Sequence, residues 1–561
     1  MDVKEFLLEM RKLGVSFSVR DGKLRSQSAR GALPAEAQAR IRAHKDAIVA
    51  FLTSTFGLDE TRAPLVPVGR DGPLALSYAQ QRLWFLDQLE PGSPFYNIPI
   101  AVRLKGRLDV AALEAGLNGI VRRHEALRTR FVLDGDQPRQ EIAARLELAL
   151  PLVDLAGLPA AGREAEALRL GDEEVRTPFD LGRGPLIRCR LLRLAADDHF
   201  FLCTLHHIVG DGWSLGVFVD ELAALYAAHV ERRPAALPEL AVQYADFAHW
   251  QRQWLAGAEL ERQAGYWKQQ LAGAPALLAL PTDRPRPRVQ GHAGATLDFA
   301  VPARTAAALY ALAREQQASL FMVLAAAFGI VLGRHSGQKD ICLGTPIANR
   351  NRAEIEPLIG FFVNTLVLRT DLAGEPTFVE LLQQMRATTL AAYDHQDLPF
   401  DQVVELLRPE RSSGHAPLFQ VMLALQNAPM GELALPGLTL RRAELGTATA
   451  KHDLRLAIFE QDGGLHCSAE YRTELFDAAT IARLGRHFGC LLEAIAADPH
   501  GRIDRLPLQD AAERAAAIDA WPGCSPAWRA AATTACCCPA SPATCSNCST
   551  ARSPRRRGRP R

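Results

Sequence analysis

The sequence has no uncharged apolar run long enough to cross a membrane. Its longest, Leu320 to Leu332, falls short of the ~20 residues that a spanning helix requires, and it predicts a buried helix capped by Ser319. The first residues, Met1 to Glu5, lack both the basic segment and the apolar core of a secretory signal. We therefore expect no membrane association and a cytoplasmic location.

Neither positive nor negative charge predominates in the chain. The net charge of the chain is +1, and residues 522–561 contribute seven arginines and no acid to it, so the rest of the chain carries 57 basic against 63 acidic residues. This mildly acidic body argues against nucleic acid and against an anionic membrane surface as partners.

Cysteine is sparse in the body of the chain and crowded at its end. Six of the eleven cysteines lie in the last 38 residues, where Cys545 and Cys548 form a lone CxxC without further ligand spacing. A small metal-binding tail is therefore the lesser interpretation, and no metal site is expected. The other five stand in apolar contexts typical of reduced, buried thiols: Cys189, Cys203, Cys342, Cys467 and Cys490.

The length of 561 residues predicts two to four domains. Residues 1–56 have the pattern of a helix, a hairpin turning at Asp21-Gly22, and a second helix. Because the hairpin has an open edge, this unit is either a cap on the next domain or a docking surface for a partner's strand or peptide. Residues 57–73 contain several prolines and glycines and predict a linker.

Two adjacent histidines, His206 and His207, end an apolar run that is typical of a strand buried on both faces. Strand side chains alternate, so one imidazole should pack in the wall while the other faces a cavity. An amphipathic helix follows, with Asp211 or Ser214 as its cap. The N-terminus of that helix offers free N–H groups at Gly212, where an oxyanion would be stabilised.

Four interpretations of this segment compete. It is a structural cap, or a metal site of His206, His207 and Asp211, although adjacent strand residues diverge. The residues from Gly212 to Gly216 also match the G-x-S-x-G pattern, which would make Ser214 the nucleophile of a hydrolase. The fourth interpretation is acyl transfer with His207 as the polar catalyst between two bound substrates.

The segment from His206 to Gly212 resembles the HHxxxDG core of the condensation domains of nonribosomal peptide synthetases, whose fold is similar to that of chloramphenicol acetyltransferase. Heterocyclising relatives carry aspartates in place of these histidines, whereas epimerising relatives share the motif and remain an alternative. The other motifs of the family are matched in order by residues 77–84, 96–99, 123–131, 244–251, 359–365, 395–400 and 417–422.

The resemblance implies an α+β fold: an αββα docking domain at residues 1–56, then a two-lobed condensation domain with a central tunnel. Its N-lobe would span residues 74–250 and its C-lobe residues 251–520, followed by a tail at 521–561. That tail lacks periodicity and predicts disorder. Its composition is that of a GC-rich gene read in a wrong frame from near residue 521, so we expect truncation before adenylation and carrier domains.

The activity that the resemblance implies is amide-bond formation between thioesters on two carrier proteins, the upstream donor and the downstream acceptor. The carriers supply phosphopantetheine arms, and no cofactor of the chain's own is expected. His207 would orient the amine or move its proton, and Gly212 would hold the oxyanion. His206, Asp211 and Arg350 would be structural residues of the site, and Asp211 would pair with Arg350. The candidates for the tunnel are Trp213, Ser214, Asn364 and Gln396.

Residues 1–56 are similar to the docking domains that begin some hybrid synthetase subunits, so the C-terminal peptide of a preceding subunit is the expected partner. A chain without its own carrier depends on carriers presented by other proteins. A catalytically silent docking or scaffold fragment is therefore the main alternative function, ahead of the Ser214 hydrolase.

Overall fold

The computed structural model describes residues 63–410, 412–426, 435–443 and 449–519, together with parts of residues 6–49. The predictions made for the tail at 521–561 and for residues 57–62 of the linker lie outside the described residues.

The N-terminal unit contains an antiparallel hairpin in which β1 (Val15–Arg20) pairs with β2 (Lys23–Ser28). The helix α2 (Ala35–Ala43) follows. Phe6 is helical and buried, and its ring centre lies 5.6 Å from that of His44, just beyond α2. The described part of this unit thus has the expected order of helix, hairpin and helix.

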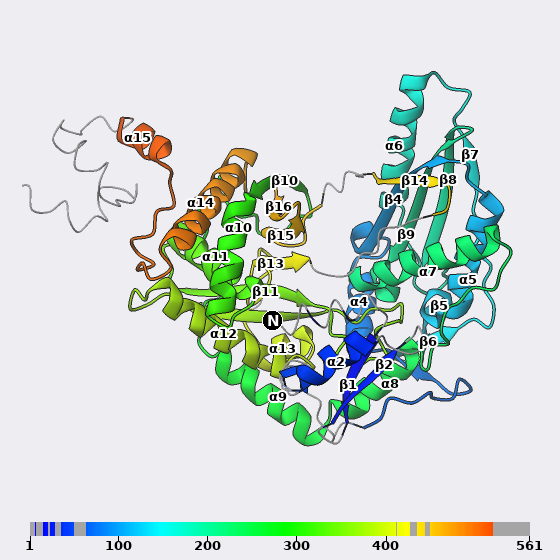
Figure 1. The fold of residues 1–561 in the computed structure, drawn as a ribbon, viewed down its shortest axis with the longest axis horizontal. Helices are drawn as coiled ribbons and strands as arrows, with labels where there is room; N and C mark the ends of the chain where they lie inside the picture. The colour runs from blue at the N-terminus through cyan, green and yellow to red at the C-terminus, as the bar shows by residue number, and fades with distance from the viewer. Residues whose placement is uncertain are drawn as a thin grey trace, which may run out of the picture.

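One lobe is built on a five-stranded sheet with the strand order β14-β4-β9-β8-β7, drawn at the right of Figure 1. Its central strand β9 is buried along nearly its whole length, as its apolar sequence predicts. Alternate side chains of β9 enter two different clusters: Phe201 and Leu205 pack with α5 and α7, and Phe200 and Leu202 pack with α6. The sheet is therefore covered by helices on both faces.

The elements of this lobe, with a small three-stranded sheet of β3, β6 and β5, have the following bounds: β3 (Leu74–Ala75), α4 (Tyr78–Leu89), η1 (Pro94–Tyr96), β4 (Asn97–Gly106), α5 (Val110–Arg123), η2 (Glu125–Arg128), β5 (Thr129–Asp134), β6 (Gln137–Ile142), β7 (Leu152–Asp154), α6 (Ala160–Arg176), β8 (Ile187–Ala195), β9 (Asp198–His206), η3 (His207–Val209), α7 (Gly212–Val230) and β14 (Leu438–Arg442).

The other lobe is built on a six-stranded sheet with the order β10-β16-β15-β13-β11-β12. Its core helix, α11 (Leu320–Ser336), is buried over almost its whole length, and the Ser319 hydroxyl accepts a hydrogen bond from the Met322 amide at its start. The predicted buried helix and its cap are confirmed. No single helix of the described residues is long and apolar enough to span a membrane; α10 and α11 pass that test only as a pair, bent by 108° at the break between them.

The remaining elements have these bounds: α8 (Tyr244–Trp254), α9 (Gly257–Gln270), β10 (Gly294–Val301), α10 (Ala303–Glu315), β11 (Asp340–Ile347), β12 (Asn364–Asp371), α12 (Phe378–Asp394), α13 (Phe400–Leu407), β13 (Val421–Gln426), β15 (Leu454–Gln461), β16 (Gly464–Arg472), α14 (Ala478–Ala497) and α15 (Ala511–Asp519).

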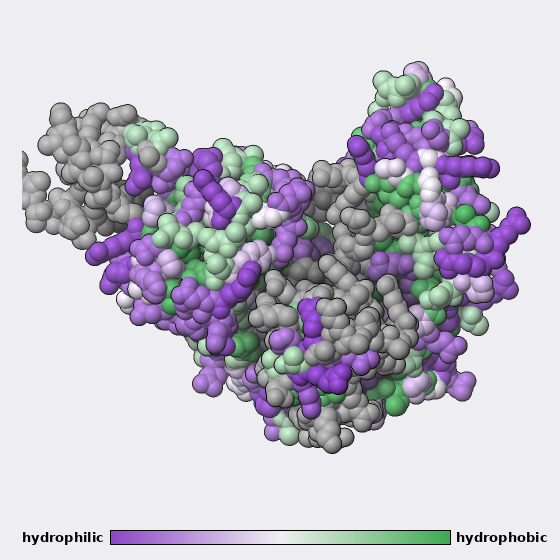
Figure 2. Space-filling model, in the orientation of Figure 1, coloured by the Kyte–Doolittle hydropathy of each residue, from purple (hydrophilic) through white to green (hydrophobic). Residues whose placement is uncertain are grey.

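The expected boundary between the lobes lies between residues 250 and 251, but two later segments pack with the first lobe. β14 leaves the second lobe and pairs antiparallel with β4 at the edge of the first lobe's sheet. Residues 355–362 place Ile355, Ile359 and Phe362 in the hydrophobic core of the first lobe. Figure 1 draws β14 beside β4 in the upper part of the first lobe, and the space-filling view is hollowed between the upper parts of the two lobes (Figure 2).

Candidate active site

The paired histidines lie where β9 passes into α7. β9 ends at His206, the short helix η3 begins at His207, and α7 begins at Gly212. Asp211 is the N-cap of α7, because its side chain accepts a 2.9 Å hydrogen bond from the Ser214 amide. The change from strand to helix within five residues brings two imidazoles, a carboxylate and a helix N-terminus together.

His206 belongs to the wall of the site. It is buried, and its Nδ1 accepts a hydrogen bond from the Ile208 amide at 3.2 Å. Its ring packs near those of Tyr96 and Phe179, at centre distances of 6.3 and 6.1 Å. Burial, with smaller contributions from His207 and from Lys451, lowers the pKa of His206 to about 3, so this ring is neutral.

His207 is only half-buried. Its ring meets that of Phe361 edge to face, with 4.8 Å between the centres. Nδ1 is buried and makes no hydrogen bond within the part of the chain that the structure describes, so the accessible part of the ring lies away from Nδ1. Burial above all, and Lys451 after it, lowers the pKa of His207 to about 4, although Asp211 opposes the shift.

Gly212, five residues after His207, faces open space. It is exposed, and a Cβ atom added to it would meet no atom within 4 Å. Its amide belongs to the first turn of α7, where N–H groups have no partner inside the helix and the helix dipole is positive. The residue therefore offers a free donor and room for a ligand at the same point.

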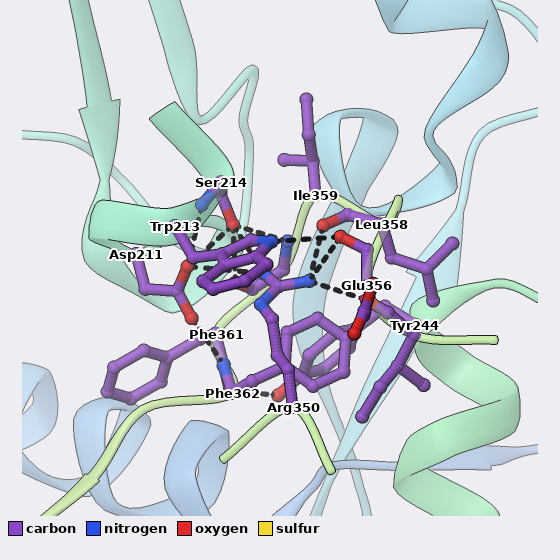
Figure 3. A network of polar contacts seen from close by, with 12 residues as sticks. Asp211, Trp213, Ser214, Tyr244, Arg350, Glu356, Leu358, Ile359, Phe361 and Phe362 are labelled. Atoms are coloured by element: carbon purple, nitrogen blue, oxygen red, sulfur yellow. Dashed lines mark hydrogen bonds and ion pairs between the residues drawn. The ribbon is translucent and has the colours of Figure 1, made fainter. Parts of the chain in front are cut away.

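Asp211 and Arg350 form a buried ion pair between the lobes (Figure 3). Arg350 Nη2 lies 3.2 Å from Asp211 Oδ1, and the two side chains are 1% and 3% exposed. Asp211 Oδ2 accepts a further hydrogen bond from the Phe362 amide at 2.9 Å. Burial alone would raise the pKa of Asp211, but Arg350 and the hydrogen bonds from Ser214 and Phe362 hold it below its usual value.

Arg350 reaches this position from the turn after β11. Asn349 has a φ of 51°, a left-handed conformation that asparagine tolerates better than most residues, and Arg350 comes next. Its Nη1 donates to the carbonyl groups of Ile355 and Leu358 at 2.6 and 2.8 Å. One guanidinium thus fixes the crossing segment at residues 355–362 and ties it to the start of α7 (Figure 3).

Ser214 is part of this network and is 1% exposed. Its hydroxyl lies 2.8 Å from Asp211 Oδ1 and 2.9 Å from the Gly360 carbonyl oxygen, and it accepts from the Gly360 amide at 3.1 Å. No histidine contacts it among the residues the structure describes. Ser214 therefore lies in the interface between the lobes and has neither the accessibility nor the adjacent base that a hydrolase nucleophile requires.

Trp213 also lies at this interface, because its Nε1 donates to the Glu356 carbonyl at 3.0 Å. Asn364 and Gln396 are brought together elsewhere. The side-chain Nδ2 of Asn364 donates to the Gln396 and Leu398 carbonyls at 2.8 and 2.9 Å, which links β12 to the loop before α13. Within the described residues, no contact joins either of them to His207.

Residues of the outlying motifs hold the crossing segment from the first lobe. The Tyr244 hydroxyl donates to the Phe361 carbonyl at 2.5 Å and lies 2.8 Å from Ser77 Oγ. His124 Nδ1 accepts from the Ile359 amide at 3.2 Å. These motifs are far apart in the sequence and meet on one segment, which explains why bulky and polar residues recur in them.

Sequence reasoning missed two neighbours of the histidines. Phe361 packs in the core of the first lobe, and its ring also contacts His207. Lys451 lies in no motif that was singled out, yet it is a cation near both histidines. A lysine three residues before the first residue of β15 was the only available signal. No group of three or more His, Cys, Asp or Glu side chains within the described ranges is placed to hold a metal ion.

The likeness to solved structures defines the class of protein. The X-domain from teicoplanin biosynthesis, solved in complex with OxyB, superposes with a TM-score of 0.72 at 31% identity, over 80% of this chain and 99% of that chain. The expected fold, two-lobed and α+β, is thereby confirmed.

A family model described as the condensation domain matches residues 71–517, so the chain belongs to the condensation-domain family of nonribosomal peptide synthetases, whose members catalyse peptide-bond formation with substrates held on carrier-bound phosphopantetheine. A second model, the TubC N-terminal docking domain, matches residues 3–53. The resemblance proposed from the sequence is confirmed for both parts.

Linear gramicidin synthase subunits B and C of Brevibacillus parabrevis are among the relatives. They are 51% identical over 478 residues and 50% identical over 460 residues, which is 84% and 82% of this chain. The chain spans only 9% and 6% of the length of these two proteins. The similarity therefore concerns one of their domains and not their whole activity.

Proposed function

We propose that this chain forms an amide bond between two substrates that arrive on separate carrier proteins, each tethered through a phosphopantetheine arm. The acceptor amine attacks the donor thioester, a C–N bond forms and the C–S bond breaks. The proton lost by the amine ends on the departing pantetheine thiolate. The observation that carries the proposal is the half-buried imidazole of His207, together with open space at Gly212 five residues further along the chain, at the start of α7.

His207 acts in this proposal as a neutral hydrogen-bond partner of the amine. With a pKa near 4 it is uncharged at physiological pH. Because Nδ1 is buried, Nε2 is the ring nitrogen that the proposal gives to the substrate. The Gly212 amide then stabilises the oxyanion of the tetrahedral intermediate.

The energetic demand on the catalyst is modest. An α-amine has a pKa near ~8, so a useful fraction is already neutral near pH 7. Holding two tethered reactants in a productive geometry supplies up to ~7–11 kcal/mol, and a positioned base adds about 10²–10⁴-fold. Asp211 and Arg350 contribute by holding the start of α7 in place, and not by contacting substrate.

The downstream carrier is proposed to dock on α4. Phe85 and Leu89 lie one turn apart on this helix and are 56% and 62% exposed, which is unusual for large apolar side chains. The pair is flanked by an ion pair between Arg82 and Asp401 at 3.0 Å. An apolar contact with a charged rim fits a small carrier that must bind and leave in each cycle. Exchange of both residues for serine should raise the KM for the acceptor carrier.

The partner of the N-terminal unit is proposed to be the C-terminal peptide of a preceding synthetase or polyketide synthase subunit. Within the described residues the β1–β2 hairpin is a two-stranded sheet, so the outer edge of each strand has no strand partner there. This supports the proposal, because an extended peptide adds a strand to such an edge. The site of action is proposed to be the cytoplasm, where carrier-bound intermediates are available.

The proposal is tested with purified donor-loaded and acceptor-loaded carriers, by following the dipeptidyl thioester with mass spectrometry. His207→Ala should lower the rate by about 10²–10⁴-fold while the thermal unfolding temperature stays near that of the wild type. His249→Ala is the control, since His249 is an exposed histidine that contacts Gln253 on α8. Product formation that is unchanged in His207→Ala would refute the role of His207, and no product from the wild type would favour a silent scaffold.

A further inference from the structure

Lys451 reaches across the space between the lobes toward the histidines. It lies three residues before Leu454, the first residue of β15 in the second lobe. Its Nζ lies 5.0 Å from the centre of the Tyr96 ring and 5.3 Å from that of Phe95. Both rings belong to η1 of the first lobe. The Tyr96 ring is in turn a neighbour of His206, so a single aromatic ring separates the ammonium group from the wall of the site.

The side chain of Lys451 lies at the boundary between the two lobes, because it belongs to the second lobe and the two rings beside its Nζ belong to the first. It is exposed to solvent, yet the surrounding protein desolvates its ammonium group enough to lower its pKa to about 8.

Charges face Lys451 from several elements. Arg455 on β15 and Arg82 on α4 oppose its positive charge, and Glu470 on β16 favours it while its carboxylate accepts from the Lys451 amide at 3.3 Å. Four more groups lie around the same space or beside it. They are Asp401 and Glu90, which act on Tyr96, and His452 and Arg472, which stand next to Lys451 or bind its backbone.

We propose that Lys451 is a positioning residue of the condensation site, whose positive charge keeps the attacking amine of the acceptor, and the His207 imidazole, in their neutral forms. This inference rests on the proposed function. It gives a role to Lys451, which is not part of the ion pair of Asp211 and Arg350. Lys451 lies near Arg82 of α4, the helix on which the carrier is proposed to dock.

The chemistry requires such a residue because His207 cannot deprotonate an ammonium group efficiently. A base with a pKa near 4 is far weaker than an α-amine with a pKa near ~8. The amine must therefore reach His207 already neutral. The positive charge that Lys451 carries below its own pKa of about 8 disfavours protonation of both groups, since like charges repel.

The first test is the pH dependence of single-turnover condensation between pH 6 and 9.5. Lys451→Met should move the acid limb upward by about one pH unit, which lowers the rate at pH 7 by about tenfold and leaves the rate at pH 9 near the wild-type value. Lys451→Arg retains the charge and should keep the wild-type limb. Lys268→Met, the same exchange on the exposed face of α9, is the control.

A second acceptor separates the electrostatic role from a structural one. An aminooxy acceptor is neutral over this whole pH range, so its rate at pH 7 should fall much less in Lys451→Met than that of the amine acceptor. A general loss of rate with an unshifted acid limb, equal for both acceptors, would overturn the proposal. Lys451→Gln serves in the same way should Lys451→Met fold poorly.

A third measurement does not depend on activity. The pKa of His207, followed by NMR of labelled histidine, should rise in Lys451→Met and stay low in Lys451→Arg. An unchanged His207 pKa would overturn the inference even if the wild type proves inactive. Absence of product from the wild type, together with a raised His207 pKa in Lys451→Met, would instead contradict the proposed function alone.

Discussion

The carboxylate of Asp211 lies 3.2 Å from the guanidinium of Arg350, in a contact that is almost completely closed to solvent. The first residue caps α7 and the second follows β11 of the other lobe. The pair therefore fixes the start of α7, on which Gly212 lies and next to which His207 stands, relative to the second lobe.

Asp211→Ala should reduce the free energy of unfolding by about 3–5 kcal/mol, because it leaves the Arg350 charge buried without its partner. Chemical denaturation followed by tryptophan fluorescence measures this loss. Asp154→Ala is the control: its ion pair with Arg193 is 47% and 41% exposed, and exposed pairs contribute little. An Asp211→Ala protein with wild-type stability but no activity would show instead that the carboxylate acts in the chemistry.

Ser214 should resist a serine-reactive fluorophosphonate probe. Its hydroxyl is buried and engaged with Asp211 and Gly360, so neither access nor activation is provided. Intact-protein mass spectrometry after incubation with the probe checks this expectation. Covalent labelling that disappears in Ser214→Ala would restore the hydrolase interpretation.

Gly212→Ala should fold normally and catalyse poorly. The new methyl group meets no protein atom within 4 Å, so the unfolding temperature should match that of the wild type. The methyl group does occupy the space proposed for the tetrahedral intermediate. We expect the rate of condensation to fall by at least tenfold, measured with loaded carriers, and a fully active variant would place the substrate elsewhere.

The protein should lose stability between pH 6.5 and pH 4. Burial lowers the pKa of His206 and His452 to about 3 and of His207 and His335 to about 4. The unfolded chain binds protons near pH 6.5 that the folded chain excludes, so stability is fully present above that pH and falls as pH decreases. Each histidine contributes up to about 1.36 kcal/mol per pH unit.

Urea denaturation at pH 7, 6 and 5 measures this slope. His206→Asn keeps an acceptor for the Ile208 amide and removes one titrating group, so the slope should decrease by one proton. His249→Asn replaces an exposed histidine on α8 and should leave the slope unchanged. A slope that is equal in wild type and His206→Asn would contradict the buried, neutral state of His206.

Local features of the site were predictable from the sequence. The buried strand before His206 and the cap at Asp211 follow from the apolar pattern and from capping chemistry. The expectation for the two histidines assumed a strand through both, but β9 ends at His206 and His207 begins η3. The partner of Asp211 is 139 positions away, and only the family resemblance pointed to Arg350. No local rule connects residues at that separation.

Other features depend on how distant segments cross, and the sequence pattern did not contain them. Phe361 has the same apolar character whether it packs in a core or against an imidazole. The crossing of residues 355–362 brings Ser214 and Trp213, two candidates for the tunnel, into contact with Gly360 and Glu356. β14 has a short, mixed sequence, and nothing in it indicates that its partner is β4.

The pairing of β14 with β4 has a consequence for synthesis on the ribosome. β14 follows β4 by roughly 330 residues, so the edge of the first sheet stays unpaired until most of the protein has emerged. That edge exposes free backbone groups during translation and is open to wrong partners. The first lobe therefore becomes complete only after nearly all of the second has been made, and an early stop in translation leaves a fragment prone to aggregate.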